Sequence, residues 1–169
     1  DNNIARANAD DTVVDISFYG LIIGFLSHEL RENARLTIEP ERMKIMEIFN
    51  MVRGHFALLI NKPFKTPAQG KEFTIAKVST KEGDWQIVLK ISTGNYAKVY
   101  ISDILRVYTF IVSSNRPLSQ AEVDDYVQKA CLTNGITPYV IPLIGTFSDI
   151  KISREPQLTI EFIPLREML

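Results

Sequence analysis

The sequence predicts one α+β domain over residues 12–169, preceded by a flexible polar arm over residues 1–11. Three observations support this class: apolar residues recur at helical spacing in the first third of the chain, the hydrophobic period changes from about 3.6 to about 2 after Gly70, and no regular βαβ alternation follows. We therefore expect two N-terminal helices and one later helix packed on an antiparallel or mixed sheet of about five to six strands.

The composition indicates a globular, soluble protein. Of the 169 residues, 46% are hydrophobic and 23% are charged, and 19 basic against 20 acidic side chains give a net charge of -1. The molecule as a whole is therefore not attracted to polyanions, and a nucleic-acid site would have to be a local patch. The single Cys131 excludes an intramolecular disulfide and predicts a cytoplasmic or other reducing intracellular compartment. The apolar stretch 16–26 is too short for a membrane span.

Two helices are expected first. Phe18, Ile22 and Phe25 recur at helical spacing, and this helix carries more apolar surface than one face needs. A second helix is expected to begin near Pro40 and to end near Asn61, with one apolar face formed by Ile45, Ile48, Phe49, Val52, Phe56 and Leu59.

Strands are expected after the loop marked by Pro63, Pro67 and Gly70. Residues 72–80 should pair with residues 85–91 through a turn at 81–84, because Ile87, Leu89 and Ile91 alternate with more polar positions. A turn at residues 93–95 should then lead into a strand at 98–101, which completes a three-stranded meander.

The remainder should contain one helix among strands. Residues 103–114 are apolar on both alternate faces, which suits either a helix or a strand, and their Val, Ile, Tyr and Thr content favours a buried strand over a helix. Ser119 and Glu122 have capping-box spacing and predict a helix start, with Asn134 and Gly135 as the terminator. Strands are expected at residues 137–144, where two prolines favour a sheet edge, and at residues 157–163.

No motif in the chain specifies a reaction. His28 and Glu29 begin a sequence similar to the zinc-binding HExxH motif, but Glu32 stands where the second histidine is required. We therefore predict no metal, no cofactor and no catalytic residues. Cys131 is expected to be an inert thiol packed in the core. A hydrolase that uses His28, Glu29 and His55 is the third hypothesis, and it requires these side chains to converge on a cleft.

The second hypothesis concerns local charge. Residues 62–98 contain seven lysines against three acidic residues, a net charge of +4. Lysines and aromatic side chains on one face of a sheet can bind single-stranded nucleic acid, and the candidates are Lys77, Lys90, Lys98, Tyr96 and Tyr100, with Phe64 nearby in sequence. Lysines on the solvent side of a sheet also prevent edge-to-edge aggregation, which is the competing explanation.

Residues 112–117, with the sequence Val-Ser-Ser-Asn-Arg-Pro, are similar to a short stretch of vesiculovirus matrix proteins. The rest of the chain differs from those proteins in length and element order. The resemblance therefore implies no function and no site residue here.

The first hypothesis is a non-enzymatic module for protein–protein interaction or assembly. It would work through the excess apolar surface of the first helix, at Phe18, Ile22 and Phe25, with the polar arm as an accessory. The partner would be another protein or a second copy in a homo-oligomer.

Overall fold

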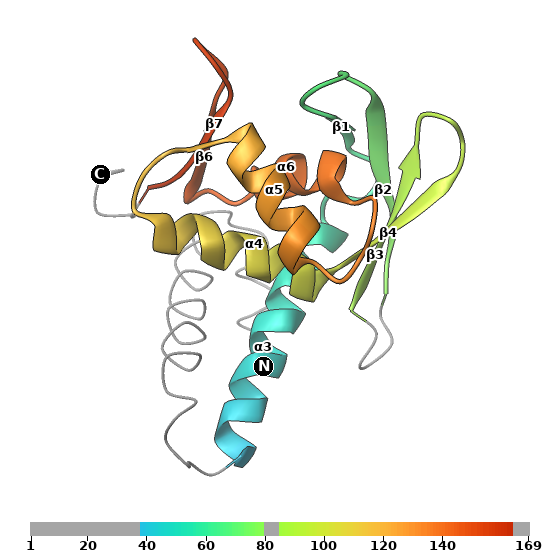
Figure 1. The fold of residues 1–169 in the computed structure, drawn as a ribbon. Helices are drawn as coiled ribbons and strands as arrows, with labels where there is room; N and C mark the ends of the chain where they lie inside the picture. The colour runs from blue at the N-terminus through green and yellow to red at the C-terminus, as the bar shows by residue number, and fades with distance from the viewer. Residues whose placement is uncertain (1–37, 80–84, 164–169) are drawn as a thin grey trace. The chain divides into compact units, whose positions relative to one another are not determined.

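A computed structural model describes residues 38–79 and 85–163 of the chain, with the side chains of residues 38–45 left aside. The chain divides into two compact units, Asp1–His55 and Phe56–Leu169, and each is considered by itself. The described residues form four helices and two β-sheets, of four and three strands (Figure 1). The predicted α+β class is therefore confirmed. No helix within the described residues is long and apolar enough to cross a membrane.

Helix α3 (Ile38–Ala57) contains the described residues of the first unit and enters the second at its last turn. The predicted apolar face is present, because Ile48, Val52 and Phe56 follow one another at four-residue spacing and are all buried. The helix ends four residues before the predicted end near Asn61. The amide N–H of Asn61 instead donates to the carbonyl of Ile75 on a strand, with φ at 65°.

The larger sheet has the order β1-β2-β3-β4, and every pairing in it is antiparallel. Its last three strands are the predicted meander, which is confirmed. Residues 63–65 were expected to lie in a loop, but they form the short strand β1, which pairs with β2 at the edge of the sheet. The strands are β1 (Pro63–Lys65), β2 (Glu72–Val78), β3 (Gln86–Ile91) and β4 (Tyr96–Tyr100).

Residues 103–114 were predicted to be a strand, and this was wrong, because they belong to helix α4 (Ile101–Ser114). Ile104, Leu105, Tyr108 and Ile111 are buried at helical spacing along it. The strand preference of Val, Ile and Thr is worth less than about 1 kcal/mol per residue. Burial of each large apolar side chain contributes about 1.5–3 kcal/mol, which decides the outcome.

Helix α5 (Gln120–Ala130) begins as predicted. The Ser119 side chain accepts from the Glu122 backbone N–H, and the Glu122 carboxylate accepts from the Ser119 backbone N–H, which completes the capping box. The helix ends before the predicted terminator at Asn134 and Gly135. The buried carboxylate of Asp103 accepts from the N–H groups of Leu132 and Thr133, and these bonds hold the chain in a turn.

The segment predicted as a strand at residues 137–144 is also a helix, α6 (Thr137–Ile144). Pro138 lies in its first turn, where the missing N–H costs no hydrogen bond, and Pro142 removes only one bond from the helix interior. Val140, Ile141, Leu143 and Ile144 are buried on this short helix, so core packing outweighs that loss.

A second, smaller sheet closes the described chain. It consists of β5 (Leu118–Ser119), β6 (Ile150–Ser153) and β7 (Thr159–Phe162), in the order β5-β7-β6 with antiparallel pairings. Strand β7 confirms the prediction for residues 157–163, whereas β6 was not predicted. The rings of Tyr108 on α4 and Phe147 meet edge to face with centroids 5.7 Å apart. This contact joins α4 to the segment between α6 and β6.

Candidate functional site

The five residues proposed for nucleic-acid binding all lie on one face of the larger sheet. We call this the open face, and it is formed by Thr74, Lys77, Gln86, Val88, Lys90, Tyr96, Lys98 and Tyr100. Lys77, Lys90 and Lys98 are exposed, and Tyr96 and Tyr100 are 64% and 38% exposed. The alternate positions of the same strands are buried on the opposite face: Phe73, Ile75, Val78, Ile87, Leu89 and Val99. The sheet therefore has one core face and one solvent face.

The strand register makes the lysines neighbours. Val88 on β3 is paired with Lys77 on β2 and with Lys98 on β4, so the two lysines flank one apolar side chain at about 10 Å across two strand spacings. Lys90 lies two residues along β3, about 7 Å from Val88. A register shift between Ile75 and Lys77 allows β2 to present Lys77 on this face. The three ammonium groups thus share a small area.

The two tyrosines stand at the ends of β4. Tyr96 is paired with Lys90, and Tyr100 is paired with Gln86, whose amide Nε2 donates to the Tyr100 hydroxyl at 3.4 Å. Phe64 does not join them. Its ring stacks on buried Phe73, with centroids 5.3 Å apart, and so belongs to the core side of the sheet.

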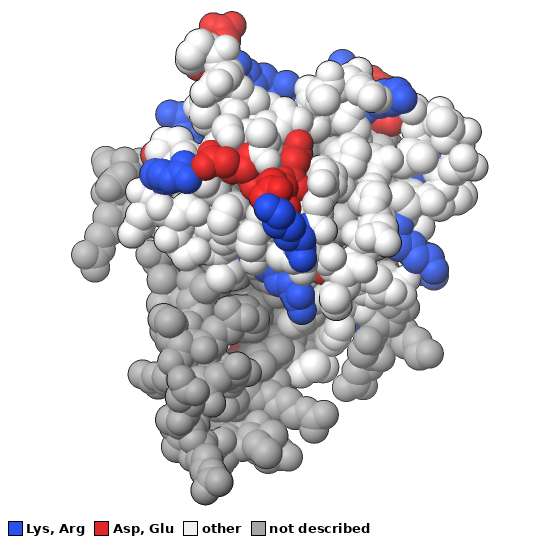
Figure 2. All heavy atoms as spheres, viewed as in Figure 1, with Lys and Arg blue, Asp and Glu red and all other residues white. Residues whose placement is uncertain are grey.

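The positive charge of the open face is not neutralised within the described part of the chain. None of Lys77, Lys90 and Lys98 forms an ion pair there. Figure 2 shows acidic side chains gathered instead over α5, the helix that carries Glu122, Asp124 and Asp125. Uncompensated lysines on a sheet can attract phosphate groups.

The other two hypotheses depend mainly on residues that the structure does not describe. Phe18, Ile22, Phe25, His28 and Glu29 lie outside the described residues. His55 is half-buried in the last turn of α3. No group of three or more His, Cys, Asp or Glu residues that could hold a metal ion occurs among the described residues.

Cys131 is half-buried after α5, near Asp103 on α4. Burial, followed by the negative charge of Asp103, raises the pKa of its thiol to about 11. The thiol is therefore protonated at neutral pH. A protonated thiol is a poor nucleophile.

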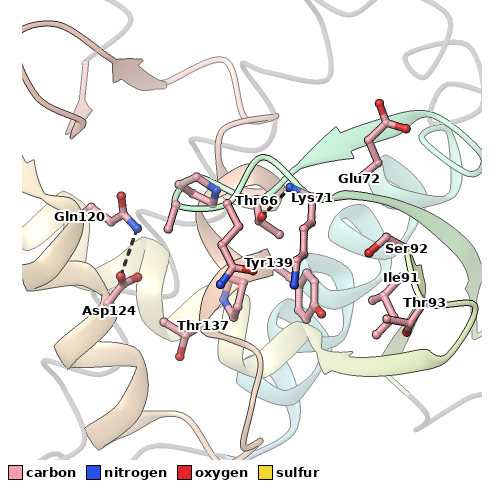
Figure 3. A pocket seen from close by; sticks show the side chains of 14 residues that line it. Thr66, Lys71, Glu72, Ile91, Ser92, Thr93, Gln120, Asp124, Thr137 and Tyr139 are labelled. Atoms are coloured by element: carbon pink, nitrogen blue, oxygen red, sulfur yellow. Dashed lines mark hydrogen bonds between the residues drawn. The ribbon is translucent and has the colours of Figure 1, made fainter.

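The structure contains a pocket of about 240 Å³ that the sequence analysis did not predict. Four parts of the chain line it: the turn between β1 and β2 with the first residue of β2, the last residue of β3 with the turn that follows, the residues Gln120 and Asp124 of α5, and the first turn of α6 (Figure 3). These parts are separated by up to 73 positions in the sequence, from 66 to 139. No local pattern in the sequence could have indicated the pocket.

Comparisons with protein-family models, with curated proteins and with solved structures found no match for this chain.

Proposed function

We propose that this chain is a non-enzymatic binding protein that binds single-stranded nucleic acid through the open face. The observation that carries the proposal is the strand register, which puts Lys77, Lys90, Lys98 and Tyr96 on one exposed face. Lysines contribute attraction to phosphates that does not depend on sequence, and exposed aromatic rings provide surfaces on which bases stack. A single strand is favoured over a duplex because its bases are free to stack on Tyr96.

The competing explanation, protection of a sheet edge, covers only part of this arrangement. Lysines that prevent aggregation are needed on edge strands, and Lys98 on β4 fits that role. Lys77 and Lys90 lie on β2 and β3, which are the two inner strands of the sheet. Tyr96 adds exposed apolar surface at the edge, which edge protection would not favour. Ligand binding accounts for all four side chains.

The test is fluorescence anisotropy with a labelled oligothymidylate of about 20 nucleotides, longer than the roughly 4–16 nucleotides that small binding domains cover. Wild type is compared with the double variant Lys77→Gln/Lys90→Gln. The matched control is Lys129→Gln/Lys151→Gln, which removes two exposed lysines from α5 and β6. We expect weaker binding in the first variant alone. Equal binding by all three proteins, or none by wild type at low salt, would refute the proposal.

A second candidate function is assembly with a protein partner or a second copy, through Phe18, Ile22 and Phe25. Among the described residues, the large aliphatic side chains Leu58, Ile60 and Leu132 are 51%, 37% and 75% exposed, so apolar surface is available for a protein contact as well. Light scattering across protein concentration, with and without the oligonucleotide, separates the two functions. A defined oligomer that ignores the oligonucleotide and is lost in Phe18→Ser/Phe25→Ser would favour assembly. A monomer that binds the oligonucleotide only at low salt would favour the open face.

A further inference from the structure

The two exposed tyrosines of the open face lie on one regular stretch of strand β4. Residues 96–100 pair with residues 86–90 of β3 without a register shift, and Tyr100 keeps an extended backbone, with φ at -87° and ψ at 139°. Tyr96 and Tyr100 therefore stand on the same face, and at about 3.3 Å per residue their Cα atoms are about 13 Å apart. Lys98 lies midway between them, about 7 Å from each.

Both tyrosine rings are available for stacking. Neither ring stacks on another aromatic ring among the described residues, and Tyr96 and Tyr100 are 64% and 38% exposed. The Tyr100 hydroxyl accepts from Gln86 Nε2 at 3.4 Å, which is long for a hydrogen bond but shows that the ring leans over β3. Tyr100 thus lies over the open face and does not turn away from it.

The outer side of β4 carries main-chain groups that the sheet does not use. The Ile91 N–H donates to the Asn95 carbonyl at 2.9 Å at the start of the ladder, so the odd-numbered residues of β4 bond to β3. The N–H and C=O groups of Tyr96 and Lys98 therefore point away from β3, to a side where no further strand lies among the described residues. A ligand that lies along β4 can use these groups, whereas a ligand that crosses the inner strands meets side chains only.

The distance between the two rings limits which bases can reach both. Stacked bases follow one another at about 3.4 Å per nucleotide, so two stacked neighbours span only about a quarter of the roughly 13 Å between Tyr96 and Tyr100. A strand that uses both rings must therefore be extended, with its bases splayed apart. A nucleotide between the two stacked bases would bring its phosphates near Lys98.

We propose that a single strand of nucleic acid runs along β4, with one base on Tyr96, the next base but one on Tyr100 and the intervening phosphates at Lys98. This inference rests on the proposed function, and it adds Tyr100 as a second stacking residue and a fixed spacing between the two stacked bases. Lys90 is paired with Tyr96 and continues the path of the phosphates at that end. The ligand is thus a strand of at least three nucleotides with unpaired bases, in any base sequence.

The test is competition against the labelled oligothymidylate by unlabelled strands of about eight nucleotides, within the roughly 4–16 that one small domain covers. Abasic sites replace most bases, so all strands carry the same phosphates. One strand has two neighbouring thymines, one has an abasic site between its two thymines, and one has a single thymine. We expect the strand with spaced thymines to bind about fivefold or more tighter than the other two, the lower end of what one stacked base contributes.

The outcomes of this competition separate the inference from the proposed function. If wild type binds the oligothymidylate but binds all three strands equally, or binds neighbouring thymines most tightly, the spacing along β4 is wrong and the proposed function stands. If wild type does not bind the oligothymidylate at low salt, both are wrong.

Variants assign the two stacked bases to their rings. In Tyr96→Ala and in Tyr100→Ala the advantage of the spaced thymines should fall to within about twofold. Tyr100→Phe keeps the ring and should keep the advantage, and Lys98→Gln should weaken all three strands by the same factor, because it removes only charge. Thermal unfolding of each variant shows whether it is folded. An advantage that survives Tyr100→Ala, or that is lost in Lys98→Gln, would contradict this assignment.

Discussion

The salt dependence of oligonucleotide binding is the most direct quantitative consequence of the open face. Three lysines share this face, so we expect three phosphates to be contacted. Each phosphate contact on a single strand contributes about −0.7 to the slope of log K against log salt concentration, which gives about −2.1 for wild type. A fourfold increase in salt, from about 50 to about 200 mM, should then weaken binding about 18-fold.

Neutralising two of these lysines changes the slope by a calculable amount. The variant Lys77→Gln/Lys90→Gln retains only Lys98 on the open face, so the slope should become shallower, at about −0.7. The same salt increase should then weaken binding only about threefold. Anisotropy titrations at four or more salt concentrations measure both slopes. The control Lys129→Gln/Lys151→Gln carries the same net charge and should keep the wild-type slope. An unchanged slope in the first variant, or equal reductions in both, would refute the assignment of phosphate contacts to this face.

Four further predictions concern single residues. Tyr96→Ala should weaken oligonucleotide binding by about 1–3 kcal/mol without changing the salt slope, because stacking rather than charge is lost; a change of slope in the anisotropy titrations would contradict this. Asp103→Ala leaves the N–H groups of Leu132 and Thr133 without their acceptor and should lower the free energy of unfolding by about 3 kcal/mol. Thr133→Val removes only the hydrogen bond from the Thr133 hydroxyl and should lower it by about 1 kcal/mol; urea denaturation measures both values. The thiol of Cys131, whose pKa is about 11 against 9.0 for a free thiol, should react with iodoacetamide about 100-fold more slowly in the folded protein than in urea; equal rates would refute its burial. Hydrogen bonds from Arg116 and Ser119 lower the pKa of Glu122 to about 2, so its stabilising contribution is present above its unfolded pKa near 4.5 and is lost as the pH falls toward 2; Glu122→Gln should flatten the stability profile in this window.

Local sequence signals predicted the parts of the fold that depend on neighbouring residues. The capping box of Ser119 and Glu122 requires only three positions of sequence, and it was found where expected. The meander likewise follows from alternation along each strand and from the turn at Gly94, which has a φ of 85°. The same alternation placed Lys90 on the solvent face of β3. Lys77 is different, because it has the spacing of buried Phe73 and Ile75 and reaches the open face only through the register shift after Ile75, which alternation does not predict.

The errors concern two segments that are rich in apolar residues. In residues 103–114 and 137–144 both alternate positions carry apolar side chains, so the sequence does not separate the period of a strand from that of a helix, although only half of the residues in each helix are buried. Their state is decided by what covers them, which composition does not reveal. The end of α5 was misplaced for a related reason. It depends on Asp103, which accepts from Thr133 thirty positions later in the chain.

The junction between β4 and α4 restricts where this chain can change its length. Tyr100 is the last residue of the strand and the N-cap of the helix, so no linking residue separates the two. One inserted residue here would turn the buried side of α4 by about 100° and would displace it along its axis by about 1.5 Å. The turns at residues 67–70 and 92–95 lie at hairpin ends and contain no buried residue, so added residues there disturb no core contact. In any set of related sequences, we therefore expect insertions and deletions to collect at these two hairpins and to avoid position 100.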